Sequence, residues 1–345
     1  MVFVGMVVTV SLTFTFMDVL YCSSKKLHKK QQRQSANFTF NMFNSTTVLQ
    51  KRTIWISSHY PVTLLQSYKI NNPGICRNIS KLSAVVIVNT SPDNFERRNL
   101  MRKTWLNSTF YYPETIRVVF LLGIVSNLLL QFKIENENSV HKDIVQGHFI
   151  DSYHNLTNKG VMGLKWITEH CQNAEFVVKV DDDVFVNFFK VFKEISFIKH
   201  KKRYIMCHRM IEGTNPIQRQ VEDKWYVAKD EFKLMNHYPF VSCSGLVVFM
   251  SSDLIPLMYT AAFMCPFFWI DDIYLFGILP TKINGVVHHE INANISIYKE
   301  ETDNCFQKSG SQCKLIAGVA DPDVINVVRR SWKAVIGNDS SITLP

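Results

Sequence analysis

The chain has 345 residues, of which 47% are hydrophobic and 19% charged, so a disordered protein is excluded and a sizeable core is expected. At about 150 residues per domain, this length predicts two domains or one large α/β domain with additional segments. The net charge of +9 comes mostly from seven basic residues between Lys25 and Arg52, a segment without acidic residues. Residues 53–345 carry 31 basic and 28 acidic side chains, so we expect no nucleic-acid partner.

The first 22 residues form an apolar segment that contains a single acidic residue, Asp18. Its length is close to that of a membrane-spanning helix, so it is interpreted as a signal-anchor or as a cleaved signal peptide. The basic residues that follow favour keeping their side of a membrane in the cytoplasm. Residues 23–80 are polar and have no clear pattern, which is typical of a stem or linker.

Two features favour the lumen of the secretory pathway over the cytoplasm. The chain has eight cysteines, which suit an oxidising compartment. If Cys22 belongs to the anchor, seven remain, so at least one is free or forms an intermolecular bond. Asn-X-Ser/Thr triplets, the acceptors of N-linked glycans, begin at Asn37, Asn44, Asn78, Asn89, Asn107, Asn155, Asn294 and Asn338.

Strand and helix patterns alternate from residue 82 onward. Continuous apolar runs at 84–88, 117–123 and 176–180 predict buried parallel strands, and the patterns at 98–105 and 161–171 predict helices. This alternation predicts an α/β domain over residues 81–335 with a mixed, mostly parallel sheet flanked by helices. Ligands of such sheets bind outside the carboxyl ends of the strands.

Three acidic residues, Asp181, Asp182 and Asp183, end the third predicted strand. Because side chains alternate along a strand, Asp181 and Asp183 are expected on one face and Asp182 on the other. Two carboxylates on one face suit a hard cation such as magnesium or manganese, with phosphate oxygens as further ligands. The alternative is an acidic turn or helix cap, since an apolar, helix-like stretch follows at 184–198.

A second acidic pair, Asp271 and Asp272, lies in the apolar and aromatic segment FFWIDDIYLFG. Burial of a carboxylate there is costly unless the group has a partner or a function. Burial also raises the pKa of a carboxyl group toward the range of a general base. The pair is therefore a candidate for catalysis.

Six blocks follow in order: RNLMRKTW at 98–105, VFLLG at 119–123, DIV at 143–145 with FIDSYHNLTNK at 149–159, KVDDDVFVN at 179–187, YP at 238–239 and DDIY at 271–274. Together they resemble the β-1,3-galactosyltransferase family, glycosyltransferase family 31, which has the GT-A fold. The resemblance implies a single-pass type II protein of the Golgi membrane with a lumenal catalytic domain. It also implies inverting transfer of galactose from UDP-galactose, or of another UDP-hexose, to the 3-hydroxyl of an acceptor glycan on glycoprotein or glycolipid.

The resemblance also implies roles for individual residues. Asp272 would deprotonate the acceptor hydroxyl, and Asp181 and Asp183 would hold Mn²⁺ on the diphosphate. The implied substrate-binding residues are Arg98, Arg102, Tyr153, Lys159, Asp182 and Asp271.

The chain departs from the family pattern at several positions, most importantly at Gly318. The family has a histidine there that is usually a third metal ligand, and its loss would weaken the site or change its metal preference. His288 and His289 are possible substitutes, although a surface histidine pair is the preferred interpretation. Two alternatives to galactosyl transfer remain open: a β-1,3-N-acetylglucosaminyltransferase, and a lapsed transferase that binds sugars or partner proteins without turnover.

Overall fold

The computed structural model describes residues 67–337 of the chain. The predicted signal-anchor or signal peptide (1–22) and most of the predicted stem therefore lie outside the described residues. Within the described part, no helix combines the length and the apolar character needed to cross a membrane.

The main element is an eight-stranded mixed sheet with the strand order β1-β4-β3-β2-β5-β8-β7-β9. Strands β2, β3, β4 and β5 are mutually parallel, and β8 runs antiparallel to both β5 and β7. The strands are β1 (Tyr68–Ile70), β2 (Leu82–Asn89), β3 (Ile116–Ile124), β4 (Ile144–Ile150), β5 (Ala174–Asp181), β7 (Tyr204–Met210), β8 (Ser242–Ser251) and β9 (Val287–Glu290).

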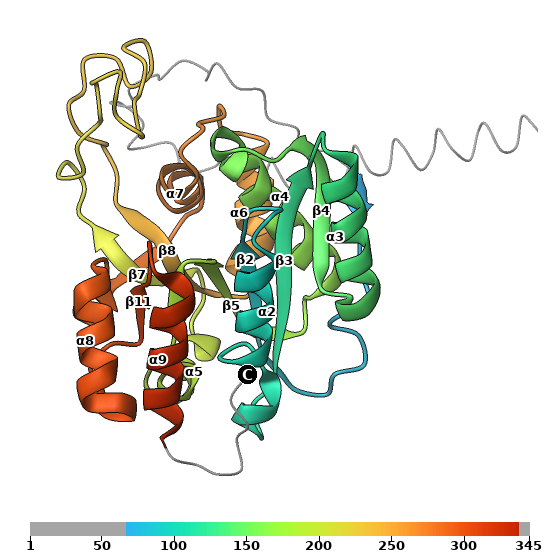
Figure 1. The fold of residues 1–345 in the computed structure, drawn as a ribbon. Helices are drawn as coiled ribbons and strands as arrows, with labels where there is room; N and C mark the ends of the chain where they lie inside the picture. Colours follow the sequence, from blue (N-terminus) through green and yellow to red (C-terminus); the bar gives the residue numbers. More distant parts are fainter. Residues whose placement is uncertain (1–66, 338–345) are drawn as a thin grey trace, which may run out of the picture. The chain divides into compact units, whose positions relative to one another are not determined.

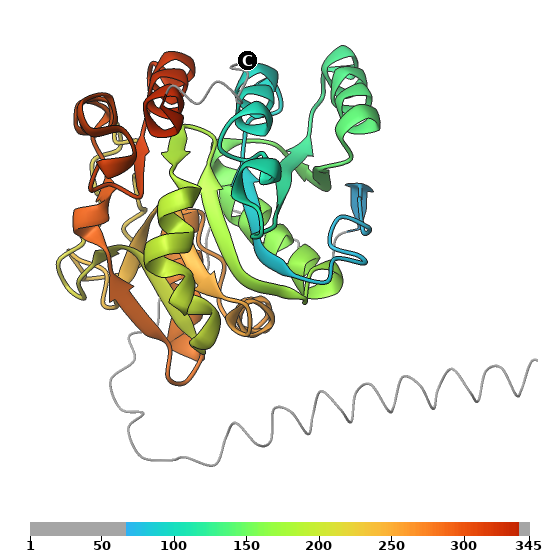
Figure 2. The same cartoon turned by 90° about the horizontal axis from the view of Figure 1, so that it is seen from below.

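Helices cover both faces of this sheet (Figure 1). Along β2, Val85 and Ile87 belong to a core cluster shared with α4 and α6, whereas Val86 and Val88 belong to a second cluster shared with α2, α3 and α9. Seen from below, α9, α2 and α3 stand in one row (Figure 2). The helices are α2 (Phe95–Lys103), α3 (Leu128–His141), α4 (Leu156–His170), α5 (Phe188–Lys190), α6 (Leu254–Ala262), α7 (Asp271–Ile273), α8 (Lys299–Ser309) and α9 (Val324–Ile336).

The elements predicted from the sequence are present. The three predicted strands are β2, β3 and β5, and the two predicted helices are α2 and α4. All eight residues of β2 are buried, as a continuous apolar run between two helical layers requires. The predicted mixed α/β sheet flanked by helices is thereby confirmed.

The helix-like stretch at 184–198 begins instead as a strand. Residues 184–186 form β6 (Val184–Val186) in a small sheet of order β10-β11-β6, with β10 (Ile295–Ser296) and β11 (Ala317–Val319). β6 pairs with the C-terminal strand β11, a partner more than 130 residues away along the chain that local sequence does not reveal. Helical structure begins only at Phe188.

The sheet extends N-terminal to the predicted domain start at residue 81. β1 lies within the segment predicted as a stem, yet it pairs with β4. A disulfide joins Cys76 to Cys171 at the end of α4 and ties this segment to the sheet layer. Two further disulfides, Cys207–Cys243 and Cys305–Cys313, leave Cys265 as the free cysteine of residues 67–337, in agreement with the expected unpaired thiol.

Candidate active site

A pocket of ≈540 Å³ opens where the parallel strands β2 and β5 end. The turn after β4, the start of β8 and the start of α7 complete its wall. This is the edge where open α/β sheets bind ligands, and the volume is typical of a small-molecule site. The pocket brings together seven of the nine predicted site residues: Tyr153, Lys159, Asp181, Asp182, Asp183, Asp271 and Asp272.

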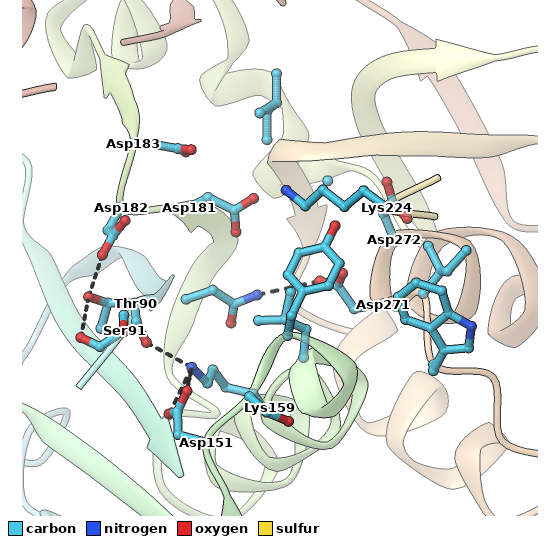
Figure 3. A pocket seen from close by; sticks show the side chains of 18 of the residues that line it. Thr90, Ser91, Asp151, Lys159, Asp181, Asp182, Asp183, Lys224, Asp271 and Asp272 are labelled. Atoms are coloured by element: carbon cyan, nitrogen blue, oxygen red, sulfur yellow. Dashed lines mark hydrogen bonds and ion pairs between the residues drawn. The ribbon is translucent and has the colours of Figure 1, made fainter. Parts of the chain in front are cut away.

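The three acids that end β5 point in two directions, as strand alternation predicts (Figure 3). Asp182 turns to the side of α2 and accepts hydrogen bonds from Thr90 Oγ1 at 2.5 Å and Asn94 Nδ2 at 2.8 Å. It also forms an ion pair with Arg97 at 2.9 Å. Both oxygens of its carboxylate therefore have partners within the protein. Asp182 thereby holds the segment between β2 and α2, here called the Thr90 loop, against the end of β5.

Asp181 and Asp183 face the pocket. Burial raises the pKa of Asp181 to about 7, although the neighbouring ammonium of Lys179 opposes this shift. Burial and the charge of Asp182 also raise the pKa of Asp183. Asp183 Oδ1 is buried and has no hydrogen-bond partner among the described residues, so this oxygen remains available to a ligand.

A buried lysine, Lys179, lies beneath these acids. Its Nζ donates to Asp181 Oδ1 at 2.7 Å and to the carbonyl of Gly245 at 2.5 Å, and it lies 3.7 Å from Asp271 Oδ2. Burial alone would lower the pKa of Lys179, but the charges of Asp181 and Asp271 raise it above its ordinary value. Lys179 thus joins the two acidic pairs of the pocket through one cation.

Sequence reasoning did not single out Lys179, although a signal was present. It is a lysine inside the apolar run of β5, two positions before Asp181 and hence on the same face of the strand. Such a residue is rarely buried without a charged partner.

Asp271 and Asp272 form the first turn of α7, which begins directly after the apolar segment 267–270. Asp272 Oδ1 accepts the backbone N–H of Ile273 at 2.8 Å. Burial and the adjacent charge of Asp271 raise the pKa of Asp272 to about 7. This is the range of a general base at neutral pH, as its apolar sequence context predicts for Asp272.

Lys159 on α4 and Tyr153 just before that helix both line the pocket. Lys159 is buried, donating to the carbonyl of Thr90 at 2.7 Å and to Asp151 Oδ1 at 3.1 Å. Tyr153 is partly exposed, and its hydroxyl accepts a hydrogen bond from Trp225 Nε1 at 2.8 Å. Lys159 therefore supports the pocket wall, whereas Tyr153 presents its ring to the interior.

The two predicted arginines do not line this pocket. Arg98 is fully buried and pairs with Glu137 at 2.7 Å, and Arg102 pairs with Glu137 and Asp143 at 2.7 and 2.8 Å. Arg98 also donates to the carbonyls of Ser91 and Pro92, two residues of the pocket wall. Arg98 thus supports the pocket wall from behind through the carbonyls of Ser91 and Pro92. Arg102 lies farther from the pocket and shares Glu137 with Arg98.

Two further lining residues, Lys224 and Trp225, come from the long connection between β7 and β8, residues 211–241. The ammonium of Lys224 lies 4.4 Å from the centroid of the Tyr153 ring. Sequence reasoning missed both residues because this connection has no periodic pattern that would place them in space.

The carboxylates fit a divalent cation only in part. Asp181 and Asp183 offer oxygen ligands on one side of the strand end, and Asp183 Oδ1 has no other partner in the described part of the chain. Within residues 67–337, however, no group of three or more His, Cys, Asp or Glu side chains is arranged to hold a metal ion. A cation here would need the oxygens of a bound diphosphate to complete its coordination.

Gly318 offers no replacement ligand, because its side-chain direction is filled. An added Cβ would lie 2.2 Å from Thr302 Oγ1 on α8. His288 and His289 do not line the pocket either: His288 Nε2 contacts the carbonyl of Phe276 at 2.9 Å, and the His289 ring stacks on Tyr204.

Residues 96–291 match the family model described as Galactosyltransferase. β-1,3-Galactosyltransferase 1 of Mus musculus and of Homo sapiens is 32% identical over 243 residues, which cover 67% of this chain and 72% of the relative. UDP-GalNAc:β-1,3-N-acetylgalactosaminyltransferase 1 of Homo sapiens is 28% identical over 225 residues, or 64% of this chain and 66% of that protein. Among solved structures, the galactosyltransferase LgtC with donor and acceptor sugar analogs aligns over 76% of this chain and 97% of its own, with a TM-score of 0.35 and 11% identity.

The family match spans more than half of the chain and contains the ends of β5 and β8 and the first turn of α7. The 32% identity extends over two thirds of the chain. The chain therefore belongs to the galactosyltransferase family and is a glycosyltransferase of its β-1,3 group.

Proposed function

We propose that this protein transfers galactose from UDP-galactose to the 3-hydroxyl of an acceptor glycan on glycoprotein or glycolipid, with inversion at the anomeric carbon. The observation that carries this proposal is the pairing, in one pocket, of a buried carboxyl group with a raised pKa, Asp272, and two carboxylates suited to a cation, Asp181 and Asp183. Membership of the family supports the donor class and the β-1,3 linkage.

Asp272 acts as the general base. Its carboxylate takes the proton of the acceptor 3-hydroxyl while the hydroxyl oxygen bonds to the anomeric carbon and the bond from that carbon to the phosphate oxygen breaks. One displacement converts the α-linked sugar of the donor into a β-linked product and releases UDP. Asp271 and Lys179 hold Asp272 in an environment where it is an effective base near neutral pH.

Asp181 and Asp183 would hold Mn²⁺ together with the diphosphate of the donor. A cation there supplies positive charge to the departing diphosphate. Asp182 fixes the strand end from the other side, and Lys159 fixes the Thr90 loop through its hydrogen bond to the Thr90 carbonyl. These contacts keep the acidic edge rigid while the donor enters.

N-Acetylgalactosamine is the second candidate donor, because a relative 28% identical over 225 residues is named for that transfer. N-Acetylglucosamine remains a third. A lapsed transferase is the alternative outside catalysis, and the missing third metal ligand at position 318 is the observation that favours it.

We also propose a Golgi location, with the catalytic domain in the lumen and the N-terminal segment as membrane anchor. Three disulfides among the described residues suit an oxidising compartment, and membership of the family supports the same assignment.

A donor screen tests the proposal. The purified full chain is incubated with UDP-galactose, UDP-N-acetylgalactosamine or UDP-N-acetylglucosamine, β-linked acceptors and Mn²⁺, and the linkage of any product is determined. We expect a β-1,3-linked galactoside. A product with another sugar would assign the donor differently, and UDP binding without transfer to any acceptor would support the lapsed form.

A further inference from the structure

The pocket is rich in negative charge, although the donor proposed for it is itself an anion. Six carboxylates line it, at Asp151, Asp181, Asp182, Asp183, Asp271 and Asp272, and the lining contains two cations, Lys159 and Lys224. Two more cations behind the lining, Arg97 and Lys179, are already paired with Asp182 and Asp181. Lys159 is neutralised by Asp151 at 3.0 Å. A diphosphate therefore needs a cation that the protein has not already paired.

Lys224 is that cation. It is exposed, lines the pocket, and forms no ion pair with any residue of the described part of the chain. Its ammonium lies 4.4 Å from the ring centroid of Tyr153 and 5.6 Å from that of Trp225. In Figure 3 its amine points across the pocket toward the strand end that carries Asp181.

The segment that presents Lys224 is held in place at both of its ends. Val227 donates its backbone N–H to Gln218 at 2.8 Å, which closes a short lobe around Lys224. Arg219 binds this lobe to the rest of the connection through five carbonyl oxygens, at residues 227, 228, 231, 232 and 235. Trp225 Nε1 then ties the lobe to the pocket wall through the Tyr153 hydroxyl.

The metal side of the pocket makes a protein cation more important in this chain. Gly318 supplies no third ligand, and Thr302 occupies the space that a side chain there would need. A cation held by only two protein ligands, Asp181 and Asp183, would neutralise the negative charge of the diphosphate less completely. A lysine opposite the strand end compensates it directly.

We propose that Lys224 binds the diphosphate group of the nucleotide-sugar donor and retains that contact as UDP leaves. The proposal rests on the function proposed above. It assigns to the connection 211–241 a donor-binding role, with Trp225 and the Tyr153 ring holding the lysine side chain in the extended form seen over the pocket.

Isothermal titration of the full chain with UDP and with uridine, with and without Mn²⁺, tests the assignment. The variants are Lys224→Met, Lys224→Arg and Lys229→Met, the last a control because Lys229 is exposed on the same connection and does not line the pocket. Lys224→Met is expected to weaken UDP binding by about tenfold or more, as for loss of a charge-assisted contact, and to leave uridine binding unchanged. Lys224→Arg and Lys229→Met are expected to bind UDP nearly as the wild type does.

Wild-type affinity for UDP in Lys224→Met would overturn the assignment. An equal loss for UDP and uridine would also overturn it, because that result indicates a misplaced connection rather than a missing charge. If the wild-type chain binds no UDP at all, the proposed function itself fails, and this outcome is distinct from the other two.

Discussion

Gly245 of β8 passes so close to Asp272 that a methyl group at Gly245 would lie 2.9 Å from the Asp272 Cβ. The same methyl group would lie 3.3 Å from Lys179 Nζ, whose hydrogen bond to the Gly245 carbonyl joins β8 to β5. The absence of a side chain at position 245 therefore sets the distance between the proposed base and the acidic strand end.

Gly245→Ala is expected to displace Asp272 and to lower kcat by about 10- to 100-fold, because a catalytic group misplaced by about 1 Å loses that much rate. Overpacking would also lower stability by about 1–3 kcal/mol. Steady-state kinetics and denaturant unfolding check both effects. Gly74→Ala is the matched control, since no atom of residues 67–337 lies within 4 Å of a Cβ added there. Equal kcat values for the two variants would show that the close approach at Gly245 has no role.

Lys179→Met leaves Asp181 and Asp271 without their shared cation in a buried setting. Removal of one member of a buried ion pair typically costs about 3–5 kcal/mol, and we expect a loss of that order in the free energy of unfolding. Lys314→Met is the comparison, because Lys314 pairs with Glu301 at 3.2 Å with 65% of its side chain exposed. That variant should lose less than about 1 kcal/mol. Similar losses in the free energy of unfolding in both variants would show that Lys179 contributes no more to stability than an exposed ion pair.

Activity should rise with pH through about 7. Burial and the negative charge of Asp271 raise the pKa of Asp272 to about 7. Only the deprotonated carboxylate, which predominates above that pH, can take the proton of the acceptor 3-hydroxyl. Asp271→Asn removes the neighbouring negative charge, so the pKa of Asp272 falls and the acidic limb of the kcat profile should move to lower pH. A limb that stays in place in Asp271→Asn, or that moves to higher pH, would argue against Asp272 as the titrating base.

A histidine introduced at position 318 should cost stability rather than create a metal site. An added Cβ would lie 2.2 Å from Thr302 Oγ1 and 2.8 Å from Thr302 Cγ2, so Gly318→His is expected to lose about 1–3 kcal/mol. Combining it with Thr302→Ala removes both of those atoms and should recover part of the loss. Thermal unfolding of the two variants checks this. A Gly318→His variant as stable as the wild type would show that α8 moves aside without loss of stability.

The sequence was sufficient to predict the strands that form the acidic edge and the directions of Asp181 and Asp182, because these depend on local periodicity. It was also sufficient to place Asp271 and Asp272 in an apolar environment. It did not reveal that β6 is a strand, because its partner β11 is remote in the chain. The positions of Lys224 and Trp225 depend on an irregular connection fixed by the five carbonyl contacts of Arg219, and no local pattern encodes those contacts.

The partners of Arg98 and Arg102 are a second feature that the sequence does not reveal. The resemblance implies that Arg98 and Arg102 bind substrate, but their guanidinium groups pair with Glu137 and Asp143. Glu137 and Asp143 lie on and just after α3, which reaches α2 only in the folded chain. Residue type alone does not distinguish an arginine that contacts a ligand from one that supports the wall behind it.

Asp272 is the proposed base of a UDP-sugar transfer in this pocket. The most direct test measures acceptor-dependent UDP release by the full chain and by Asp272→Asn, with UDP binding measured on both proteins. We expect release by the wild type, a loss of release of about 100-fold or more in Asp272→Asn, and similar UDP affinity in the two proteins. Undiminished release in Asp272→Asn, or no release from a folded wild type that binds UDP, would contradict it.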